Sequence, residues 1–382
     1  MSKNNKTRVA VVYNHVGDDI YEKIREVDPE TLDFEPEYNI KVATITEEYE
    51  AIADALREEG YEVSLLNILE NLDTLIELLK NDPPDVVFNL IEFYRGDTEL
   101  EYLVAGLFIL YGVRFTGATP FTLGLCLRKG MTKQLLLANN VPTPRYKLLS
   151  EPQLQRRHGL HYPIIIKPAR EDASSGVDKN SVVFNLDQLN ERIKKAFDEF
   201  YPPILVEEFI EGRELHVSVF GNDPPEVLPI IEFDFSGLPD GHPDLISYDA
   251  KWNPLEESFH RIHAVCPAKL TKRVEKKVRE TALEAYKITG CRDYARLDMR
   301  LTKDNKVYVL EVNPNPDLTE GVSFMDSSEQ YGLTFGETLA KIVEFALSRD
   351  LPSYPVEMQP SEESNPGIKI EKKEENFKEE KE

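Results

Sequence analysis

The stretch YVLEVNPNPDLTEG, Tyr308 to Gly321, begins as an apolar strand and ends in Glu311 and Asn313 before a proline-rich turn. Side chains two residues apart on a strand point to the same face, so these two oxygen-bearing groups can hold one ion between them. Oxygen ligands suit a hard cation. A plain strand that runs into a polar turn explains the same pattern, so other segments of the chain have to decide.

A second stretch, YARLDMRL at Tyr294 to Leu301, places Arg296 and Asp298 on one face in the same way. If the two stretches pair through a turn at 303–305, all four side chains converge on one side of a hairpin. Three oxygen donors then suit one or two Mg²⁺ ions that bridge nucleotide phosphates. Arg296 would neutralise charge that develops on a transferred group.

Further upstream, charged residues stand at the ends of other predicted strands. Lys167 closes the apolar run YPIII, where it can bind a phosphate or simply meet solvent. The loop REDASSGV at 170–177 can cover phosphates with backbone amides and hydroxyls, although an ordinary hairpin turn explains it equally well. Glu207 ends one strand and Glu214 begins the next, and both carboxylates can accept from an amine or from ribose hydroxyls.

Composition restricts the classes of partner. The chain has 382 residues and a formal net charge of -24, and nucleic acids and anionic membranes are approached through basic patches, so neither is expected. Its three cysteines are far apart in the sequence and have no metal-ligand spacing, so neither a disulfide framework nor a zinc site is expected. This indicates a reducing compartment. The apolar run at 9–12 is too short for a signal segment, and no segment reaches the roughly 20 apolar residues of a membrane span. We expect a cytoplasmic protein.

The first 127 residues alternate between strand and helix patterns, which predicts a parallel α/β domain. Thr46 is the expected N-cap of its first regular helix, and the acidic segment 15–44 is expected to be an inserted loop. The C-terminal two thirds of the chain read as α+β. The predicted domains are 1–127, a central lobe at 128–221, a C-terminal lobe at 222–352, and a disordered charged tail at 353–382.

Within the C-terminal lobe, LTKRVEKKVRETALEAYKITG is predicted to be a long helix with Thr271 as its cap and Gly290 at its end. None of the five histidines that invite a catalytic role (His15, His216, His242, His260 and His263) stands in a nucleophile–base pattern. His216 is expected to be structural.

From about Lys129 to Ala346 the chain resembles the ATP-grasp carboxylate–amine ligases, most closely the D-alanine:D-alanine ligases. The matching stretches follow the order of the family: YPIIIKPAREDASSGV, LVEEFIEGRELHVSVFG, YDAKW, CPAKL, ITGCRDYARLDMRL and LEVNPNPDLT. The resemblance implies an N-terminal α/β domain followed by a two-lobed ATP-grasp fold, with ATP bound between the lobes. It also implies Mg²⁺, for which Mn²⁺ can substitute, and an acyl-phosphate intermediate that an amine captures. Dimers are usual among such ligases.

The resemblance assigns roles to individual residues. It gives the metal site to Asp298, Glu311 and Asn313, and the catalytic roles to Arg296 and Lys251. The implied ATP-binding residues are Lys129, Lys167, Glu171, Ser174, Ser175, Gly176, Glu207, Glu208, Phe209 and Glu214. Within this set, Glu207 would contact the adenine amino group and Glu214 the ribose.

The substrate side departs from the family pattern. Family members hold two D-alanines with a glutamate, a serine and a tyrosine. Here the serine is replaced by Ala173 and the tyrosine by Trp252, and the Gly-rich segment with its glutamate is absent. The glycine after the metal asparagine is Asp317. The candidate substrate residues are Asp18, Asp19, Glu99, Trp252 and Asp317.

We therefore expect a ligase that joins a carboxylate to an amine, with a small-molecule or peptide substrate that differs from two D-alanines. Three alternatives stay open. These alternatives are a true D-alanine:D-alanine ligase of cell-wall synthesis, an ATP-grasp enzyme that modifies a peptide or natural-product amino acid, and a non-catalytic ATP-binding regulatory protein. The presence of Arg296 beside three metal ligands argues against the last, since a pure binder needs no group placed for a transition state.

Overall fold

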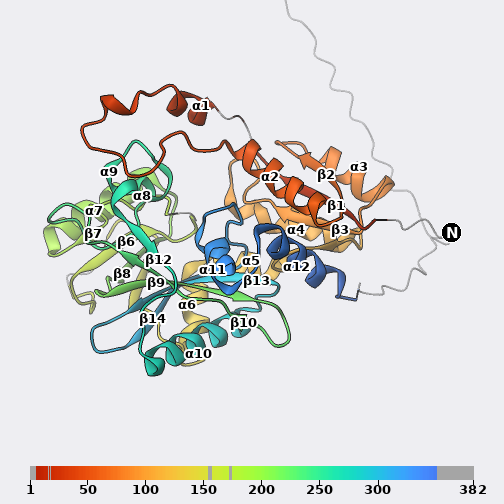
Figure 1. The fold of residues 1–382 in the computed structure, drawn as a ribbon. Helices are drawn as coiled ribbons and strands as arrows, with labels where there is room; N and C mark the ends of the chain where they lie inside the picture. The colour runs from red at the N-terminus through yellow and green to blue at the C-terminus, as the bar shows by residue number, and fades with distance from the viewer. Residues whose placement is uncertain (1–5, 16, 18, 154–156, 172–173, 351–382) are drawn as a thin grey trace, which may run out of the picture. The chain divides into compact units, whose positions relative to one another are not determined.

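The computed structural model describes residues 6–15, 17, 19–153, 157–171 and 174–350. These residues form three β-sheets with helices packed against them (Figure 1). The tail predicted at 353–382 lies outside the described residues. No helix in the described part of the chain is long and apolar enough to cross a membrane.

The N-terminal sheet is parallel, as the strand–helix alternation predicts, with the strand order β2-β1-β3-β4. Its strands are β1 (Arg8–Tyr13), β2 (Glu62–Asn67), β3 (Val86–Leu90) and β4 (Arg114–Phe115). The helices around it are α2 (Ile45–Glu58), α3 (Asp73–Asn81), α4 (Glu101–Leu110) and α12 (Phe335–Leu347).

Helices cover both faces of this sheet, which explains why the middle of β1 is apolar at every position. Val9 and Val11 lie in one buried cluster with residues of α2 and α12, whereas Ala10 and Val12 lie in another with residues of α3 and α4. Figure 1 shows α12, in blue, beside α2. The last described helix therefore completes the core of the N-terminal sheet, although the predicted domain bounds place it in the C-terminal lobe.

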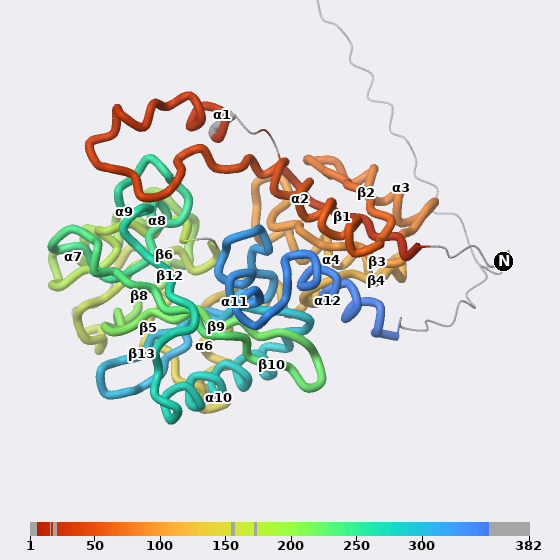
Figure 2. The backbone as a smooth tube through the Cα atoms, viewed as in Figure 1, coloured from red at the N-terminus to blue at the C-terminus, as the bar shows by residue number. Residues whose placement is uncertain are grey.

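The segment between β1 and α2, expected to be an irregular loop, contains the helix α1 (Asp19–Arg25) and the 3-10 turn η1 (Pro29–Thr31). The tube in Figure 2 leaves the N-terminal sheet, runs past α8 (Tyr248–Trp252) and α9 (Glu257–Arg261), and returns to α2. We call residues 26–44 the strap. Its Tyr38 backbone N–H donates to Nδ1 of His260 at 3.1 Å, so the strap is held onto α9.

Helix α2 begins at Ile45 with Thr44 as its N-cap, so the prediction of Thr46 as the cap was wrong. The backbone N–H of Glu47 donates to the Thr44 hydroxyl at 3.2 Å, and the backbone N–H of Thr44 donates to the Glu47 carboxylate at 2.9 Å. This reciprocal capping box needs a glutamate or glutamine three residues after the cap. Thr46 has Tyr49 at that position and cannot form it.

A second, antiparallel sheet has the strand order β5-β8-β6-β7. Helix α7 (Leu186–Glu199) packs on it through an apolar stripe that includes Leu189 and Ile193. Its strands are β5 (Tyr146–Leu149), β6 (Ile164–Pro168), β7 (Val182–Val183) and β8 (Ile204–Glu208). Before this sheet come η2 (Thr98–Leu100), α5 (Pro120–Leu127) and α6 (Lys129–Ala138).

The third sheet is antiparallel and the largest, with the order β12-β11-β9-β13-β14 and β10 paired to β9. Its strands are β9 (Arg213–Phe220), β10 (Glu226–Val227), β11 (Ile231–Asp234), β12 (His263–Val265), β13 (Tyr294–Leu301) and β14 (Val307–Asn313). Strand β9, grouped with the central lobe in the sequence analysis, pairs here with β13 along its whole length. The chain therefore passes from the second sheet to the third in the turn between β8 and β9.

Helix α10 (Lys272–Thr289) packs on the third sheet and has the ends that the sequence predicts. The Thr271 hydroxyl accepts from the backbone N–H of Val274, and Gly290 has the left-handed conformation that closes a helix. Helix α11 (Ser323–Tyr331) contacts β9 and α12. It thus lies between the third sheet and the helix that covers the N-terminal sheet.

Candidate active site

The predicted hairpin forms. Strands β13 and β14 pair so that Arg296 lies opposite Asn313 and Asp298 lies opposite Glu311. The register then shifts by one residue at Leu310, which is a β-bulge. The four polar side chains share one face, as predicted, because the bulge places Glu311 rather than Leu310 opposite Asp298.

Asp298 is the centre of this cluster. It receives two hydrogen bonds from Arg296, Nε–Oδ1 at 2.7 Å and Nη2–Oδ2 at 3.0 Å, and a third from the Asn313 amide at 3.1 Å. The Nε2 atom of His216 lies 3.5 Å from Oδ1. Burial acts to raise the pKa of Asp298, but the Arg296 guanidinium outweighs it and holds that pKa below its usual range. Asp298 is therefore ionised.

His216, which the sequence predicts to be a structural residue, lies beside Asp298 at the site. Burial is the main cause that lowers the pKa of its imidazole to about 3, so the ring is neutral at physiological pH. The Nδ1 atom lies 2.8 Å from the Ser323 hydroxyl on α11. His216 lies opposite Asp298 because β9 pairs with β13. The local sequence pattern does not show that pairing, so it gave no signal for this residue.

A buried group of charges lies on the opposite wall. The Glu207 carboxylate lies between two lysines, with Lys133 Nζ at 2.7 Å and Lys167 Nζ at 2.8 Å. Burial acts to raise the pKa of Glu207, and the two ammonium groups lower it below its usual value. Lys133 also donates to the carbonyl of Leu310 at 3.0 Å, the residue of the β-bulge. The bulge frees that carbonyl from the strand ladder, and Lys133 takes it.

Lys133 was missed in the sequence analysis. It lies on α6, one helical turn after Lys129, and that spacing on a helix was the available signal. Lys129 donates to the backbone carbonyl of Glu171 at 2.7 Å and lies 3.4 Å from Glu311. The first residue of α6 thus connects the loop at 170–177 to the carboxylates of the hairpin.

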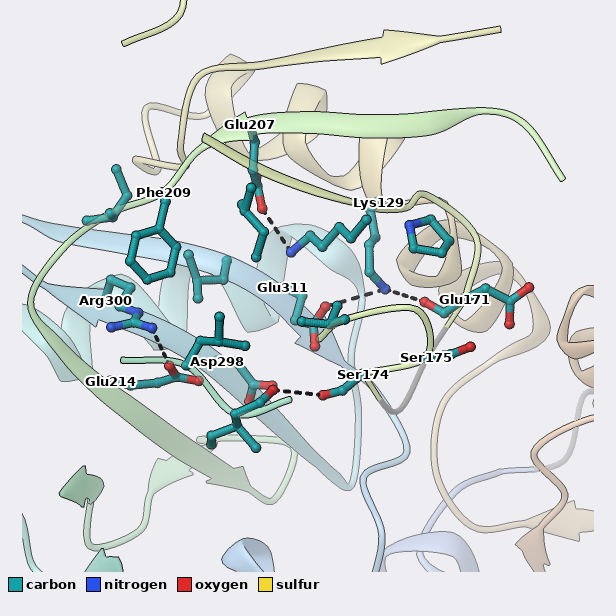
Figure 3. Close-up of a pocket in the computed structure, with 18 of the residues that line it drawn as sticks. Lys129, Glu171, Ser174, Ser175, Glu207, Phe209, Glu214, Asp298, Arg300 and Glu311 are labelled. Carbon is teal, nitrogen blue, oxygen red and sulfur yellow. Dashed lines mark hydrogen bonds and ion pairs between the residues drawn. The ribbon is translucent and has the colours of Figure 1, made fainter. Parts of the chain in front are cut away.

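At the other end of the group, Arg300 donates to Glu214 at 2.5 Å and to the carbonyl of Gly212 at 2.9 Å. Its guanidinium lies 5.1 Å from the centre of the Phe209 ring (Figure 3). Burial raises the pKa of Glu214, and Arg300 offsets part of that rise. Arg300 was also missed, although it continues the same-face series of β13 after Arg296 and Asp298.

These residues surround a cavity of about 110 Å³ between the second and third sheets, which we call the first cavity. Figure 3 shows Lys129 directed toward Glu311 and Arg300 directed toward Glu214 in this cavity. Thirteen of the predicted site residues line it: Lys129, Lys167, Glu171, Ser174, Ser175, Glu207, Glu208, Phe209, Glu214, Lys251, Arg296, Asp298 and Glu311.

Two further predicted residues support the first cavity from outside its lining. Asn313 holds Asp298, as described above. Gly176 has a positive φ of 72°, and a Cβ added there would come within 2.7 Å of the Phe200 ring. Its carbonyl accepts from Arg192 at 2.9 Å. The glycine is therefore required by the close packing of the loop.

The predicted substrate residues separate into two groups. Trp252 and Asp317 line a second cavity of about 230 Å³, together with Lys251, which lines both cavities. Glu99 lies apart from them, in ion pairs with Arg128 at 3.3 Å and Arg170 at 3.1 Å. Asp18 and the side chain of Asp19 lie outside the described residues, although Asp19 begins α1.

The donor set of the hairpin fits a hard divalent cation. This set has two carboxylates and one amide, and within the described ranges there is no group of three His, Cys, Asp or Glu side chains that could hold a metal ion. Asp298 and Glu311 supply two carboxylates and Asn313 supplies an amide oxygen, so the set consists of oxygen atoms alone, which is the preference of Mg²⁺. Two carboxylates leave positions for phosphate oxygens and water.

A parallel N-terminal sheet followed by two antiparallel sheets that enclose a charged cavity is the ATP-grasp fold. The crystal structure of D-alanine–D-alanine ligase from Bacillus anthracis complexed with ATP matches the chain with a TM-score of 0.66 and 20% identity, covering 90% of this chain and 98% of that one. At that identity the match establishes the fold.

Sequence comparisons establish the family. A family model for the D-ala D-ala ligase C-terminus matches residues 136–344. The chain is 32% identical over 311 residues to the D-alanine–D-alanine ligase of Carboxydothermus hydrogenoformans, covering 78% of this chain and 92% of the relative. It is 30% identical over 307 residues to the uncharacterized protein y4sG of Sinorhizobium fredii, covering 78% and 87%. The chain belongs to the D-alanine–D-alanine ligase family.

Proposed function

We propose that the protein is an ATP- and Mg²⁺-dependent ligase that forms a carbon–nitrogen bond between a carboxylate and an amine. The observation that carries this proposal is the pairing of Asp298 opposite Glu311 at one wall of the first cavity, with Lys129 3.4 Å from Glu311. Carboxylates for a cation and ammonium groups for phosphates then lie within one cavity. A nucleotide triphosphate is a ligand that needs both.

In this proposal different residues of the site bind different parts of the nucleotide. Glu214, held by Arg300, would accept from the ribose hydroxyls, and Phe209 would cover the base. Lys129, Lys167 and Lys251 would bind the phosphates and offset their charge. Arg296 would bind the transferred group at the edge of the hairpin. A bound Mg²⁺ would screen the phosphate oxygens and orient the terminal phosphate.

In the proposed reaction a substrate carboxylate oxygen attacks the terminal phosphorus of ATP, forming an acyl phosphate and releasing ADP. The amine nitrogen of the second substrate then attacks the acyl carbon, loses a proton and expels phosphate. A carboxylate is a poor acylating agent, and phosphorylation gives it a leaving group. The role of the site is to align the groups and to counter crowded negative charge.

The substrates are an amino acid or peptide on the carboxylate side and an amine on the other. The names of the ligase relatives favour D-alanine as a second candidate. Trp252 and Asp317, which line the second cavity in place of the tyrosine and glycine expected from the family, favour a different or larger substrate. We expect a small-molecule or peptide substrate. A homodimer is also proposed, by analogy with the family.

The test is release of ADP and phosphate from ATP and Mg²⁺ against a panel of L- and D-amino acids and dipeptides. Release that depends on a specific pair and disappears in Glu311→Ala would support a ligase, and D-alanine alone as the active compound would support the second candidate. The matched control is Glu329→Ala, an exposed position on α11. Mg²⁺-dependent ATP binding without turnover for any pair would favour a non-catalytic nucleotide-binding protein instead.

A further inference from the structure

The second cavity lies beside the first and has a strongly acidic lining. Lys251, the residue the two cavities share, is the one lysine or arginine among the described residues that line the second. Against that single ammonium group stand four carboxylates, those of Glu48, Glu92, Asp317 and Glu320. Ammonium groups are the ligands that such a surface favours.

Three of these carboxylates act on one side chain of the cavity wall, that of Tyr49. Burial raises the pKa of the Tyr49 hydroxyl, and Glu92, Asp317 and Glu48 raise it further, in that order. Tyr49 itself lies on the wall of the cavity, with its ring 4.5 Å from that of Tyr13. The three acidic side chains, which come from α2, the end of β3 and the turn after β14, therefore face a common region at the edge of the N-terminal sheet.

A separate observation indicates a second kind of ligand group. The Asn89 side chain is 1% exposed and lines the same cavity, and its amide nitrogen has no hydrogen-bond partner among the described residues. The amide nitrogen of Asn315 is also buried and has no hydrogen-bond partner among the described residues. The amide oxygen of Asn315 accepts from the backbone N–H of Ala118 at 2.8 Å. Buried donors without partners are rare and costly. Both can donate to a ligand oxygen.

Aromatic rings form much of the remaining wall. Rings of this kind cover methylene chains and attract cations through their faces. The Lys251 ammonium already lies 4.6 Å from the centre of the Trp252 ring. The aromatic residues that line the cavity are Tyr21, Tyr49, Trp252, Phe259 and Tyr294.

We propose that the second cavity binds a diamino acid, which carries an ammonium group on its side chain as well as on its α-carbon, as one of the two substrates. The carboxylate oxygens meet the amide donors of Asn89 and Asn315, and the two ammonium groups meet the carboxylates around Tyr49. A neutral amino acid brings one ammonium group to a described lining in which carboxylates outnumber ammonium groups four to one, whereas a diamino acid brings two. This inference rests on the proposed function, because it takes the cavity beside the nucleotide site as a substrate site.

The test is calorimetric titration of the full chain with L- and D-lysine in the presence of Mg²⁺ and a non-hydrolysable ATP analogue. Norleucine has the same length without the side-chain ammonium, and cadaverine has both ammonium groups without the carboxylate. Lysine is expected to bind at least about tenfold more tightly than either, a difference of about 1.4 kcal/mol. Equal affinities for lysine and norleucine, or for lysine and cadaverine, would overturn the proposal, and so would absence of lysine binding.

Two variants separate the two halves of the ligand. Asp317→Asn should weaken lysine binding more than norleucine binding, because lysine brings two ammonium groups to the carboxylates and norleucine brings one. Asn89→Leu should weaken both about equally, because both ligands carry the carboxylate. Glu77→Gln, an exposed change on α3, is the matched control. A ratio of lysine to norleucine affinity that does not change in Asp317→Asn would contradict the assignment.

Binding and turnover distinguish this inference from the proposed function. Lysine binding without ADP release from ATP for any amine partner would leave the diamino-acid site standing and remove the ligase. ADP release that depends on neutral amino acids, with no preference for lysine, would leave the ligase standing and remove the diamino-acid site.

Discussion

The Nζ atom of Lys133 lies 2.7 Å from Oε2 of Glu207, and both side chains are about 1% exposed. Burial lowers the pKa of Lys133, and the charge of Glu207 offsets part of that effect. Lys133 also donates to Thr143 at 2.9 Å and to the bulge carbonyl of Leu310. One lysine therefore joins α6, β8 and β14 at the wall of the first cavity.

Lys133→Met should destabilise the fold by about 3–5 kcal/mol, because it removes one partner of a buried ion pair and leaves Glu207 with only Lys167. Urea denaturation followed by circular dichroism measures the loss. Lys195→Met is the control, since Lys195 is half exposed and its nearest carboxylate oxygen is 3.7 Å away, so its loss should cost under about 1 kcal/mol. Equal midpoints for the two variants would show that Lys133 does not hold the site together.

Arg300→Lys should weaken binding of a non-hydrolysable ATP analogue about tenfold, or about 1.4 kcal/mol. Lysine keeps the charge but loses the planar fork that reaches Glu214 and the Gly212 carbonyl together. Glu214 is then free to rotate away from the ribose position. Calorimetric titration with Mg²⁺ present gives the affinity, and a thermal melt of the same sample shows whether folding is affected.

The control for Arg300 is Arg279→Lys on α10, where the arginine pairs with Glu275 and the carbonyl of Val227 and lines neither cavity. Its affinity for the analogue should equal that of the unchanged protein. If Arg300→Lys binds the analogue as tightly as Arg279→Lys does, Arg300 has no part in placing Glu214.

Local patterns were sufficient to pair the two strands of the site, but not to set their register. The two-residue period places Arg296 with Asp298 and Glu311 with Asn313, and the short turn predicts that the strands pair, whereas the bulge at Leu310 sets Asp298 opposite Glu311. The N-cap of α2 is also visible in the sequence, because of Thr44 and Thr46 only Thr44 has a glutamate three residues later. Sequence patterns thus carried the parts of the fold that depend on neighbours along the chain.

The remaining features depend on contacts between distant segments. The role of Lys133 depends on a bulge more than 170 residues further on, at Leu310. The position of His216 depends on the pairing of β9 with β13, and the sequence of neither strand specifies which strand it pairs with. The strap meets α9 across a separation of 222 residues. Such pairings are decided by packing of whole surfaces, which a single sequence does not display.

Glu47 gives the fold a defined response to acid. The pKa of its carboxyl is lowered from 4.5 to about 2, first by Arg25 and then by the backbone N–H of Thr44. Because the folded-state value lies below the unfolded one, Glu47 stabilises the fold above pH 4.5, and this contribution is lost as the pH falls from 4.5 toward 2. Stability should therefore fall on the acid side.

The variant Glu47→Gln keeps the acceptor of the capping box and removes the charge. Its melting temperature should lie below that of the unchanged protein at neutral pH, and the gap should narrow as the pH falls below about 4.5. Thermal melts across that range measure the gap. A gap that stays constant with pH would show that the Arg25 contact contributes nothing that depends on ionisation.

The strap should open without global unfolding when Tyr38 is removed. The Tyr38 hydroxyl lies 2.8 Å from Nδ1 of His263, and its ring stacks 6.0 Å from that of His260. Val42 and Ala43, at the end of the strap, line the second cavity, so these contacts also hold one of its walls. Tyr38→Ala should speed hydrogen exchange in residues 26–44 at least about tenfold, since local opening is controlled by local contacts.

The free energy of unfolding should change by less than about 1 kcal/mol in the same variant, because Tyr38 is 44% exposed and lies outside the large buried clusters. Tyr201→Ala, at a position 94% exposed, is the control and should leave exchange in the strap unchanged. Exchange in the strap that is equally slow in both variants would mean that Arg25, which donates to the carbonyl of Val42 at 3.1 Å, is enough to hold the segment closed. Faster exchange confined to the strap would show that Tyr38 fastens this wall of the second cavity.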